Sequence, residues 1–240
     1  MLYRFGKGAS ALIETIWIDT TGLEKPDLLG KAIAFFAEER KEHLRKLKNP
    51  FAIRLSAGAG LLLFYALKKN GLESRINDIR KGQHGKPFLP ESSFYFNLSH
   101  SGSLALCAFG DTDLGADIQQ LKETIPQKTT KILSPQEKEF LQGKEGRAQA
   151  DAFYQIWARK ESLMKWDGRG LRLPMQSFSI VQDGIPVERM IFEGKVISFQ
   201  EYRLQGYAVS ICAEQRQFSD EESIKYDKNI KELLKSEIFH

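Results

Sequence analysis

A weak internal repeat is the sequence feature that most constrains the fold of this chain. A shift of 105 residues without a gap aligns Arg54 with Arg159, Ser93-Phe94 with Ser198-Phe199, and Cys107-Ala108 with Cys212-Ala213. The order of predicted elements, a core helix followed by strands, repeats as well. We therefore predict an α+β fold of two similar halves, residues 1–118 and 119–218, followed by a charged helix or tail at 219–240. A binding site is expected in the cleft between the halves. Because one chain contains both halves, we expect a monomer.

The composition is that of an ordinary globular protein. The chain has 240 residues, 42% hydrophobic and 28% charged. Lysine and arginine (35) slightly outnumber aspartate and glutamate (31), which suits an anionic ligand but does not by itself indicate nucleic acid. No apolar run approaches the roughly 20 residues that span a bilayer, and Met1–Gly6 lacks a signal-peptide pattern. We expect neither a membrane nor a nucleic-acid partner. The two cysteines, Cys107 and Cys212, lie in apolar runs typical of core positions, which favours a reducing, cytoplasmic location.

Two helices are predicted in the first half. The segment Leu28–Leu47 has the pattern of one charged amphipathic helix that ends before Pro50, and Phe51–Leu67 is predicted to be a buried core helix. Arg54 lies in that apolar helix, so it needs an anionic partner or a route to solvent. The basic residues late in the first helix suit either a solvated face or contacts to phosphate: Arg40, Lys41, Arg45, Lys46 and Lys48.

Short apolar and β-branched runs predict the strands. They cover residues 11–19, 94–101, 104–109, 114–119, 177–181, 196–202 and 207–213. Strand alternation in the fourth run places Leu114, Ala116 and Ile118 on one face and Gly115, Asp117 and Gln119 on the other. Asp117 and Gln119 are therefore expected to be neighbours, with space beside them left by Gly115.

The second half contains a clear helix start and one long helix. Ser134-Pro135-Gln136-Glu137 has the pattern of a capping box with proline at the first helical position, and Gly143 ends that short helix. A second helix is predicted over residues 153–166, with a stop at Asp167-Gly168.

One line along this second helix carries chemistry. Trp157, Glu161 and Lys165 are spaced four apart, so they lie one turn from each other on a single face. An ordinary surface pair of Glu161 and Lys165 would have the same spacing. The rest of the chain distinguishes the two interpretations.

Four motifs occur together in a distinctive order. They are Gly85-Lys86-Pro87, Phe96-Asn97-Leu98-Ser99-His100-Ser101, Gly115-Ala116-Asp117-Ile118, and Trp157-Ala158-Arg159-Lys160-Glu161-Ser162-Leu163-Met164-Lys165 followed by Gly168-Arg169-Gly170-Leu171. In order and spacing they resemble the 4′-phosphopantetheinyl transferases of the Sfp type, over roughly residues 10–215. That family transfers the phosphopantetheine arm of coenzyme A to a serine of an acyl or peptidyl carrier protein. It uses Mg²⁺, leaves adenosine 3′,5′-bisphosphate, and has a pseudo-twofold α+β fold with its site between the halves.

The resemblance implies roles for named residues. Asp117 and Glu161 match the metal ligands, with Gln119 beside them, and Glu161 also matches a proton acceptor for the serine. Lys165 would meet the pyrophosphate and stabilise the leaving group, as phosphoryl transfer requires. The side chains matched to coenzyme A are Lys41, Arg54, Lys86, Ser99, His100 and Lys165. The match of Lys41 rests on spacing alone, and His100 and Lys86 also suit ordinary turn residues.

Gln119 departs from many bacterial relatives, which have glutamate at this position. A neutral amide still offers oxygen to Mg²⁺ or to a ligand water, so we expect a change in metal affinity and no loss of activity. Two rival functions remain. A non-catalytic homologue that binds coenzyme A or a carrier protein is disfavoured because Asp117, Glu161 and Lys165 occur together. A nucleic-acid-binding domain would need clustered exposed aromatics or a known binding motif, and the sequence has neither.

Overall fold

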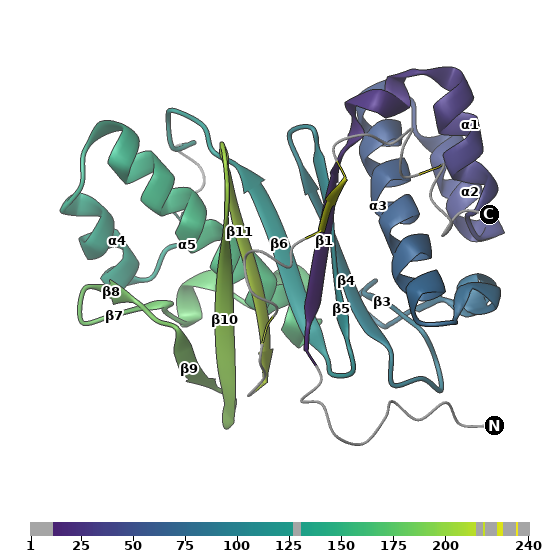
Figure 1. Ribbon diagram of the computed structural model, residues 1–240. Helices are drawn as coiled ribbons and strands as arrows, with labels where there is room; N and C mark the ends of the chain where they lie inside the picture. The colour runs from purple at the N-terminus through teal and green to yellow at the C-terminus, as the bar shows by residue number, and fades with distance from the viewer. Residues whose placement is uncertain (1–11, 127–130, 215–217, 219–224, 228–233, 235–240) are drawn as a thin grey trace.

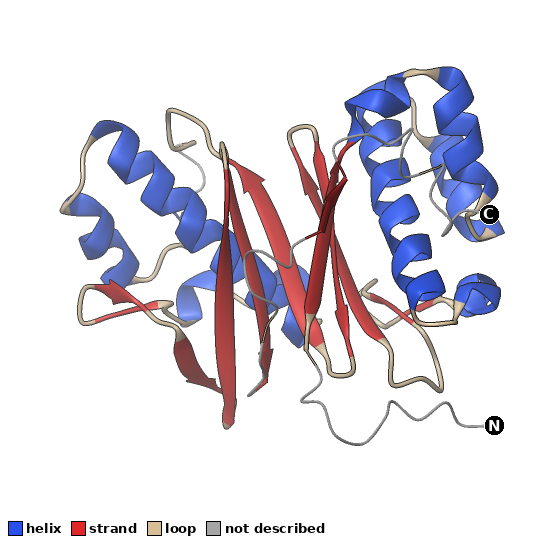
Figure 2. Cartoon of the chain, viewed as in Figure 1, coloured by secondary structure: helices blue, strands red, loops and turns tan. Residues whose placement is uncertain are grey.

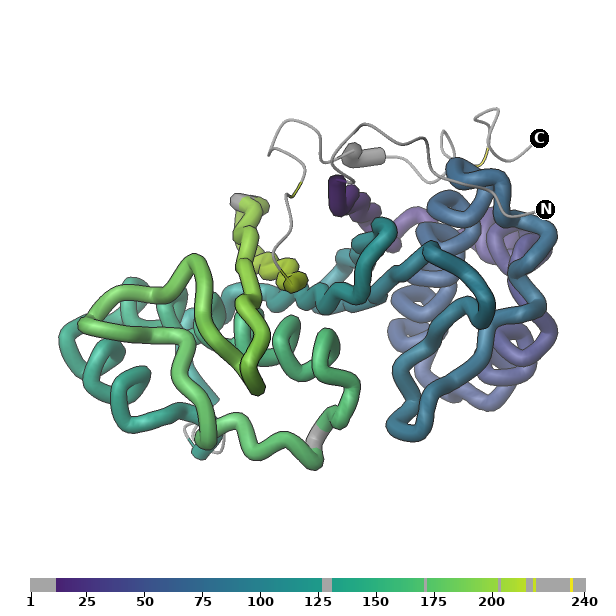
Figure 3. The backbone as a smooth tube through the Cα atoms, turned by 90° about the horizontal axis from the view of Figure 1, so that it is seen from below, coloured from purple at the N-terminus to yellow at the C-terminus, as the bar shows by residue number. Residues whose placement is uncertain are grey.

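Two four-stranded sheets pack face to face between two groups of helices (Figures 1 and 2). The computed structural model describes residues 12–126, 131–214, 218, 225–227 and 234. One group of helices lies outside the first sheet and the other outside the second, which gives a helix–sheet–sheet–helix arrangement. Seen from below, the blue first half and the green second half lie on opposite sides of the molecule (Figure 3). The mixed α+β fold predicted from the sequence is confirmed.

The first sheet has the strand order β12-β1-β5-β4. Its members are β1 (Glu14–Asp19), β4 (Tyr95–Ser101), β5 (Leu104–Gly110) and β12 (Lys225–Asp227). Between β1 and β4 the chain forms α1 (Pro26–Ala34), α2 (Glu38–Lys46), α3 (Pro50–Lys69) and the short hairpin of β2 (Arg80–Lys81) and β3 (Pro87–Phe88).

The second sheet has the strand order β6-β11-β10-β9. Its members are β6 (Leu114–Gln120), β9 (Arg189–Phe192), β10 (Lys195–Leu204) and β11 (Tyr207–Glu214). Between β6 and β9 lie α4 (Pro135–Gln142), α5 (Gly146–Asp167) and a small hairpin of β7 (Val181–Gln182) and β8 (Ile185–Pro186). The connections of β6, β10 and β11 repeat those of β1, β4 and β5, in line with the sequence repeat. A twofold axis between the halves stays a prediction, as does the boundary at residue 118, which lies within β6.

Three apolar clusters hold these layers together. The first joins α3 to one face of β1, β4 and β5. The second joins α5 to one face of β10 and β11, and the third lies between the sheets. Cys107 and Cys212 are both fully buried in these layers and both are free, as expected for core residues. Burial raises the pKa of both thiols, that of Cys212 to about 12.

Helix α3 has the apolar character that the sequence predicts. By length and composition alone it is able to cross a membrane, although no run of that length was expected. Ten of its residues are buried against the first sheet and its neighbouring helices, the pattern of a core helix.

Several predicted elements differ from the structure. The single helix Leu28–Leu47 is wrong, because α1 ends at Ala34 and α2 begins at Glu38. The long helix starts at Gly146, seven residues before the predicted start. The predicted strand 177–181 is limited to Val181, whereas β9 was not predicted. Most of the charged segment 219–240 lies outside the described residues, but Lys225–Asp227 forms a strand parallel to β1.

Gly115 allows α5 to lie directly on β6. A Cβ atom at this position would be 1.9 Å from the Ser162 carbonyl oxygen and 2.5 Å from the Trp166 amide nitrogen. Backbone atoms cannot turn aside as a flexible side chain can, so even one methyl group would push the helix off the strand. This contact sets the distance between the strand and the helix that carry the predicted site.

Replacing Gly115 with alanine is therefore expected to lower the free energy of unfolding by about 1–3 kcal/mol. Thermal unfolding of Gly115→Ala against wild type measures this as a drop of several degrees in Tm. Gly30→Ala is the matched control, because a Cβ at this position in α1 meets nothing within 4 Å. An unchanged Tm for Gly115→Ala would show that α5 and β6 are not in the close contact described.

Candidate active site

Asp117 is the centre of a polar cluster between β6 and α5. Its side chain is almost fully buried. Asp117 Oδ1 accepts hydrogen bonds from Lys165 Nζ at 2.6 Å and Ser99 Oγ at 2.7 Å. Asp117 Oδ2 accepts one from Gln119 Nε2 at 2.8 Å. The structure thus brings together four of the predicted site residues and confirms that Asp117 and Gln119 are neighbours.

Ser99 uses its whole hydrogen-bonding capacity within this cluster. Its hydroxyl donates to Asp117 and accepts from Lys165 Nζ at 2.9 Å and from the Ile118 backbone N–H at 3.3 Å. A hydroxyl has one hydrogen to donate. The predicted contact of Ser99 with a phosphate therefore requires its hydrogen to turn away from Asp117.

Glu161 faces the cluster from the same helix as Lys165. Burial raises the pKa of its carboxyl group, and the nearby Asp117 charge raises it further, while Lys165 opposes both. Among the described residues, no hydrogen bond or ion pair is recorded for Glu161. The carboxyl groups of Asp117 and Glu161 repel each other, and Glu161 has no hydrogen-bond partner among the described residues. Such a pair suits a cation that binds to both.

The fit of these residues to Mg²⁺ follows from their chemistry. The described part of the chain has no cluster of three or more His, Cys, Asp or Glu that could bind a metal. Asp117 and Glu161 supply carboxylate oxygens as ligands. Gln119 now directs its amide nitrogen at Asp117, and a rotation of the amide group would bring its oxygen to the same place. Mg²⁺ is usually bound by one or two carboxylates together with water and phosphate oxygens. The donor set therefore fits Mg²⁺ that is shared with a phosphorylated ligand.

A cavity of about 300 Å³ opens beside this cluster. Its walls come from the turn before β3, from β4, and from α5 with the loop that follows it. The lining residues are His84, Gly85, Lys86, Pro87, Asn97, Leu98, Glu161, Met164, Lys165, Gly168 and Gly170. Elements of both halves thus form one cavity, and three predicted site residues face it: Lys86, Glu161 and Lys165.

Lys86 joins the turn before β3 to the second half. Its ammonium donates to Asp113 Oδ1 at 2.6 Å and to the carbonyl oxygens of Leu114 and Trp166, each at 3.2 Å. The last of these is near the C-terminal end of α5, which stops at Gly168 in a left-handed conformation.

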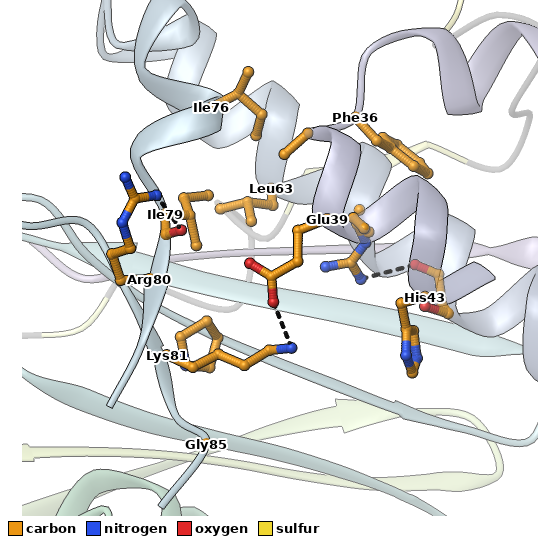
Figure 4. A pocket seen from close by; sticks show the side chains of 14 residues that line it. Phe36, Glu39, His43, Leu63, Ile76, Ile79, Arg80, Lys81 and Gly85 are labelled. Atoms are coloured by element: carbon orange, nitrogen blue, oxygen red, sulfur yellow. Dashed lines mark hydrogen bonds and ion pairs between the residues drawn. The ribbon is translucent and has the colours of Figure 1, made fainter. Parts of the chain in front are cut away.

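A second cavity of about 270 Å³ adjoins the first at the turn Gly85–Pro87 (Figure 4). Arg40 of α2 lines it and donates from Nη2 to the Ser56 carbonyl oxygen at 2.9 Å. Its Nε atom is buried and has no hydrogen-bond partner. Burial lowers the pKa of Arg40 to about 10. Gly60 leaves room for this side chain, since a Cβ there would be 2.6 Å from Arg40 Nε.

The second cavity is rich in basic side chains. His43, Arg80 and Lys81 also line it, with Glu39 as the one acidic side chain. Glu39 and Lys81 form an ion pair at 2.8 Å, drawn as a dashed line in Figure 4. His43 lies on α2, the same helix as Glu39. Sequence reasoning did not assign these residues to a site. The basic cluster that includes Arg40 was the available signal, but the spacing favoured its neighbour Lys41.

Besides Ser99, three predicted contacts with coenzyme A do not line either cavity. Lys41 pairs with Glu38 at 2.7 Å, and Arg54 pairs with Glu24 while stacking on the Phe51 ring. Arg54 thus has the anionic partner that its apolar helix requires. His100 lies on β4 and has an exposed side chain. Partial desolvation of its ring lowers its pKa, and the Lys165 charge lowers it further. The roles of these three residues stay predictions.

Comparison with known proteins defines the class. Residues 113–212 match the model of the 4′-phosphopantetheinyl transferase superfamily. A 4′-phosphopantetheinyl transferase of Bacillus subtilis is 32% identical over 78% of this chain and 85% of its own length. The transferase Sfp of Bacillus subtilis strain 168 is 30% identical over 79% and 87%, and gsp of Aneurinibacillus migulanus 27% identical over 73% and 75%. This chain therefore belongs to the 4′-phosphopantetheinyl transferase family of transferase enzymes.

Proposed function

We propose that this enzyme transfers the 4′-phosphopantetheine group of coenzyme A to a serine of an apo acyl or peptidyl carrier protein, with Mg²⁺. The serine oxygen would bond to the phosphorus next to the pantetheine arm, and the bond to the bridging pyrophosphate oxygen would break. Adenosine 3′,5′-bisphosphate would leave. The observation that carries this proposal is the position of Glu161 and Lys165 in one cavity, beside Asp117.

Each side chain at the site has a distinct part in this proposal. Asp117 and Glu161, with the oxygen of Gln119 or a water on it, would hold Mg²⁺, which supplies positive charge against the pyrophosphate. Glu161 would also accept the serine proton, because it is the carboxyl group that lines this cavity. The Lys165 ammonium would stabilise the charge that grows on the leaving phosphate. These groups all come from one chain, which supports a monomeric enzyme.

The adjoining cationic cavity is a suitable place for the 3′-phosphate of coenzyme A. Lys86 lies at the turn between the two cavities, so a ligand that extends from one to the other passes beside it. Arg40 has a buried N–H without an acceptor, and a phosphate oxygen would satisfy it. The mild excess of basic residues agrees with a substrate that carries several negative charges.

The decisive experiment is incubation with coenzyme A, Mg²⁺ and a panel of apo carrier proteins, followed by intact-mass analysis. A carrier that gains one phosphopantetheine group supports the proposal. Asp117→Ala is expected to abolish the gain while the protein stays folded by circular dichroism. Binding of coenzyme A with no gain on any carrier would favour the non-catalytic alternative. Full activity of Asp117→Ala with unchanged metal dependence would exclude Asp117 from the metal site.

Arg40→Met tests the place of the 3′-phosphate. Loss of a charged hydrogen bond is expected to raise the Kd for coenzyme A by about 10-fold or more. The Kd for dephospho-coenzyme A, which lacks the 3′-phosphate, should change little. Calorimetric titration of both ligands measures this. Arg45→Met is the matched control, because Arg45 is exposed on the same helix and does not line the cavity. Equal weakening of both ligands would place the 3′-phosphate elsewhere.

A further inference from the structure

A row of three polar side chains on β4 lies against the backbone of β6. Asn97, Ser99 and Ser101 occupy alternate positions, so they leave β4 on the same face. Asn97 Oδ1 accepts from the Ala116 N–H at 3.2 Å, Ser99 Oγ from the Ile118 N–H at 3.3 Å, and Ser101 Oγ from the Gln120 N–H at 3.0 Å. We call these three hydrogen bonds the polar ladder.

The polar ladder takes the place of a neighbouring strand. By backbone pairing, β6 is the edge strand of its sheet, with β11 on its other side. Alternate backbone N–H groups of an edge strand point away from its one partner. Ala116 and Ile118 are fully buried, so water cannot satisfy these groups. The side chains of β4 supply the acceptors, and they join the edge strands of the two sheets.

The middle rung of the ladder belongs to the site, while the outer rungs flank it. Ser99 contacts both Asp117 and Lys165. The recorded hydrogen bonds of Asn97 and Ser101 go to the β6 backbone one residue before and three residues after Asp117. Lys165 also donates to the Ala116 carbonyl oxygen at 3.1 Å, so the ladder and the lysine hold the same stretch of β6. A slip of β6 along β4 would separate Asp117 from Ser99 and from the cavity.

We propose that Asn97 and Ser101 are positioning residues for the transfer reaction. They fix β6 against β4, so that Asp117 stays in contact with Ser99 and with Lys165, which lines the cavity. This inference rests on the proposed function. It adds that the side-chain identities at 97 and 101 affect the rate through the strand that carries Asp117. It does not require either residue to touch the substrate.

The test compares two replacements of Ser101 that are nearly isosteric with each other. Ser101 does not line either cavity. Ser101→Thr keeps the hydroxyl acceptor, and Ser101→Val replaces it with a methyl group. We expect Ser101→Val to lower kcat for carrier modification by about 3- to 10-fold, the equivalent of one hydrogen bond. KM for coenzyme A should change less than 2-fold, and Ser101→Thr should keep wild-type kcat within 2-fold.

Amide hydrogen exchange supplies a second readout. In Asn97→Leu and in Ser101→Val, exchange should accelerate at Ala116, Ile118 and Gln120, while Ile211 on β11 serves as the internal reference. Equal kcat values for Ser101→Val and Ser101→Thr, or unchanged exchange along β6, would overturn the positioning role alone. Absence of transfer by the wild type on every carrier would overturn the proposed function and this inference together. If Asn97→Leu fails to fold, the Ser101 pair decides the question.

Discussion

Lys165→Met is expected to lower kcat by at least about 100-fold, as for loss of a group that stabilises charge in a transition state. The same variant is expected to bind Mn²⁺ or Mg²⁺ more tightly than wild type when coenzyme A is absent, on the order of 10-fold. One substitution would thus weaken catalysis and strengthen metal binding.

The reason lies in the hydrogen bonds of Asp117. Both of its carboxylate oxygens already accept from protein donors, and the closest is the Lys165 ammonium at 2.6 Å. A metal ion that approaches Asp117 competes with this cation, because the two charges repel at short range. Methionine removes the charge and keeps a side chain of similar length. A pyrophosphate group that attracts Lys165 would have the same effect in wild type, so coenzyme A and metal should bind cooperatively.

The measurement is a titration of Mn²⁺ followed by electron paramagnetic resonance, with and without coenzyme A, beside steady-state kinetics. Lys69→Met is the control. Lys69 is the last residue of α3, pairs with Glu14 of β1 and lines neither cavity. Unchanged metal affinity in Lys165→Met would show that the ammonium does not compete. A rise in KM for coenzyme A with normal kcat would make Lys165 a residue for substrate binding only.

Lys160→Met is expected to reduce the free energy of unfolding by about 3–5 kcal/mol, the typical cost of breaking a buried ion pair. Lys160 and Glu137 form an ion pair at 2.8 Å in which both side chains are fully inaccessible to solvent. Lys160 also donates to the carbonyl oxygens of Met175 and Phe178, each at 2.7 Å. Burial lowers the pKa of Lys160, and the Glu137 charge opposes that shift. Removing the cation leaves a buried carboxylate without its counter-charge.

Urea unfolding of a double-mutant cycle measures the coupling. Glu137→Gln keeps an acceptor for the Ile180 N–H but removes the charge. The double variant should therefore be less destabilised than the sum of the two single variants. Arg147→Met is the control, because its i,i+4 pair with Asp151 is partly exposed and should contribute under about 0.5 kcal/mol. Additive effects at Lys160 and Glu137 would contradict the pairing.

Local signals in the sequence predicted the elements that carry the site. The capping box at Ser134 is present with both of its hydrogen bonds, and Gly115 and Asp117 face α5 as strand alternation requires. The motif resemblance identified Glu161 and Lys165, which the structure places in one cavity. The capping box and the strand alternation depend only on residues close in sequence, whereas the roles of Glu161 and Lys165 came from the resemblance to a known family.

Elements that depend on distant partners were harder to predict. Residues 177–180 alternate like a strand, yet the Ile180 N–H donates to the Glu137 carboxylate and the Phe178 carbonyl oxygen accepts from Lys160. Two buried charged side chains thus make the backbone hydrogen bonds that a neighbouring strand would make. The break between α1 and α2 has neither glycine nor proline, so no local stop signal marks it. A helix pattern also does not show which of two adjacent cations points inward, and the spacing of the family motifs alone favoured Lys41 over Arg40.

The burial of Cys107 and Cys212 in the central strands has a chemical consequence. The proposed substrate and the proposed product each carry a free thiol at the end of the pantetheine arm. Exchange with a disulfide requires an accessible thiolate, and burial both encloses these two sulfurs and keeps them protonated. We therefore expect the folded enzyme to form no mixed disulfides with thiol compounds, including oxidised coenzyme A. Residual maleimide reagent in a preparation of maleimide-labelled coenzyme A should likewise leave Cys107 and Cys212 of the folded enzyme unmodified.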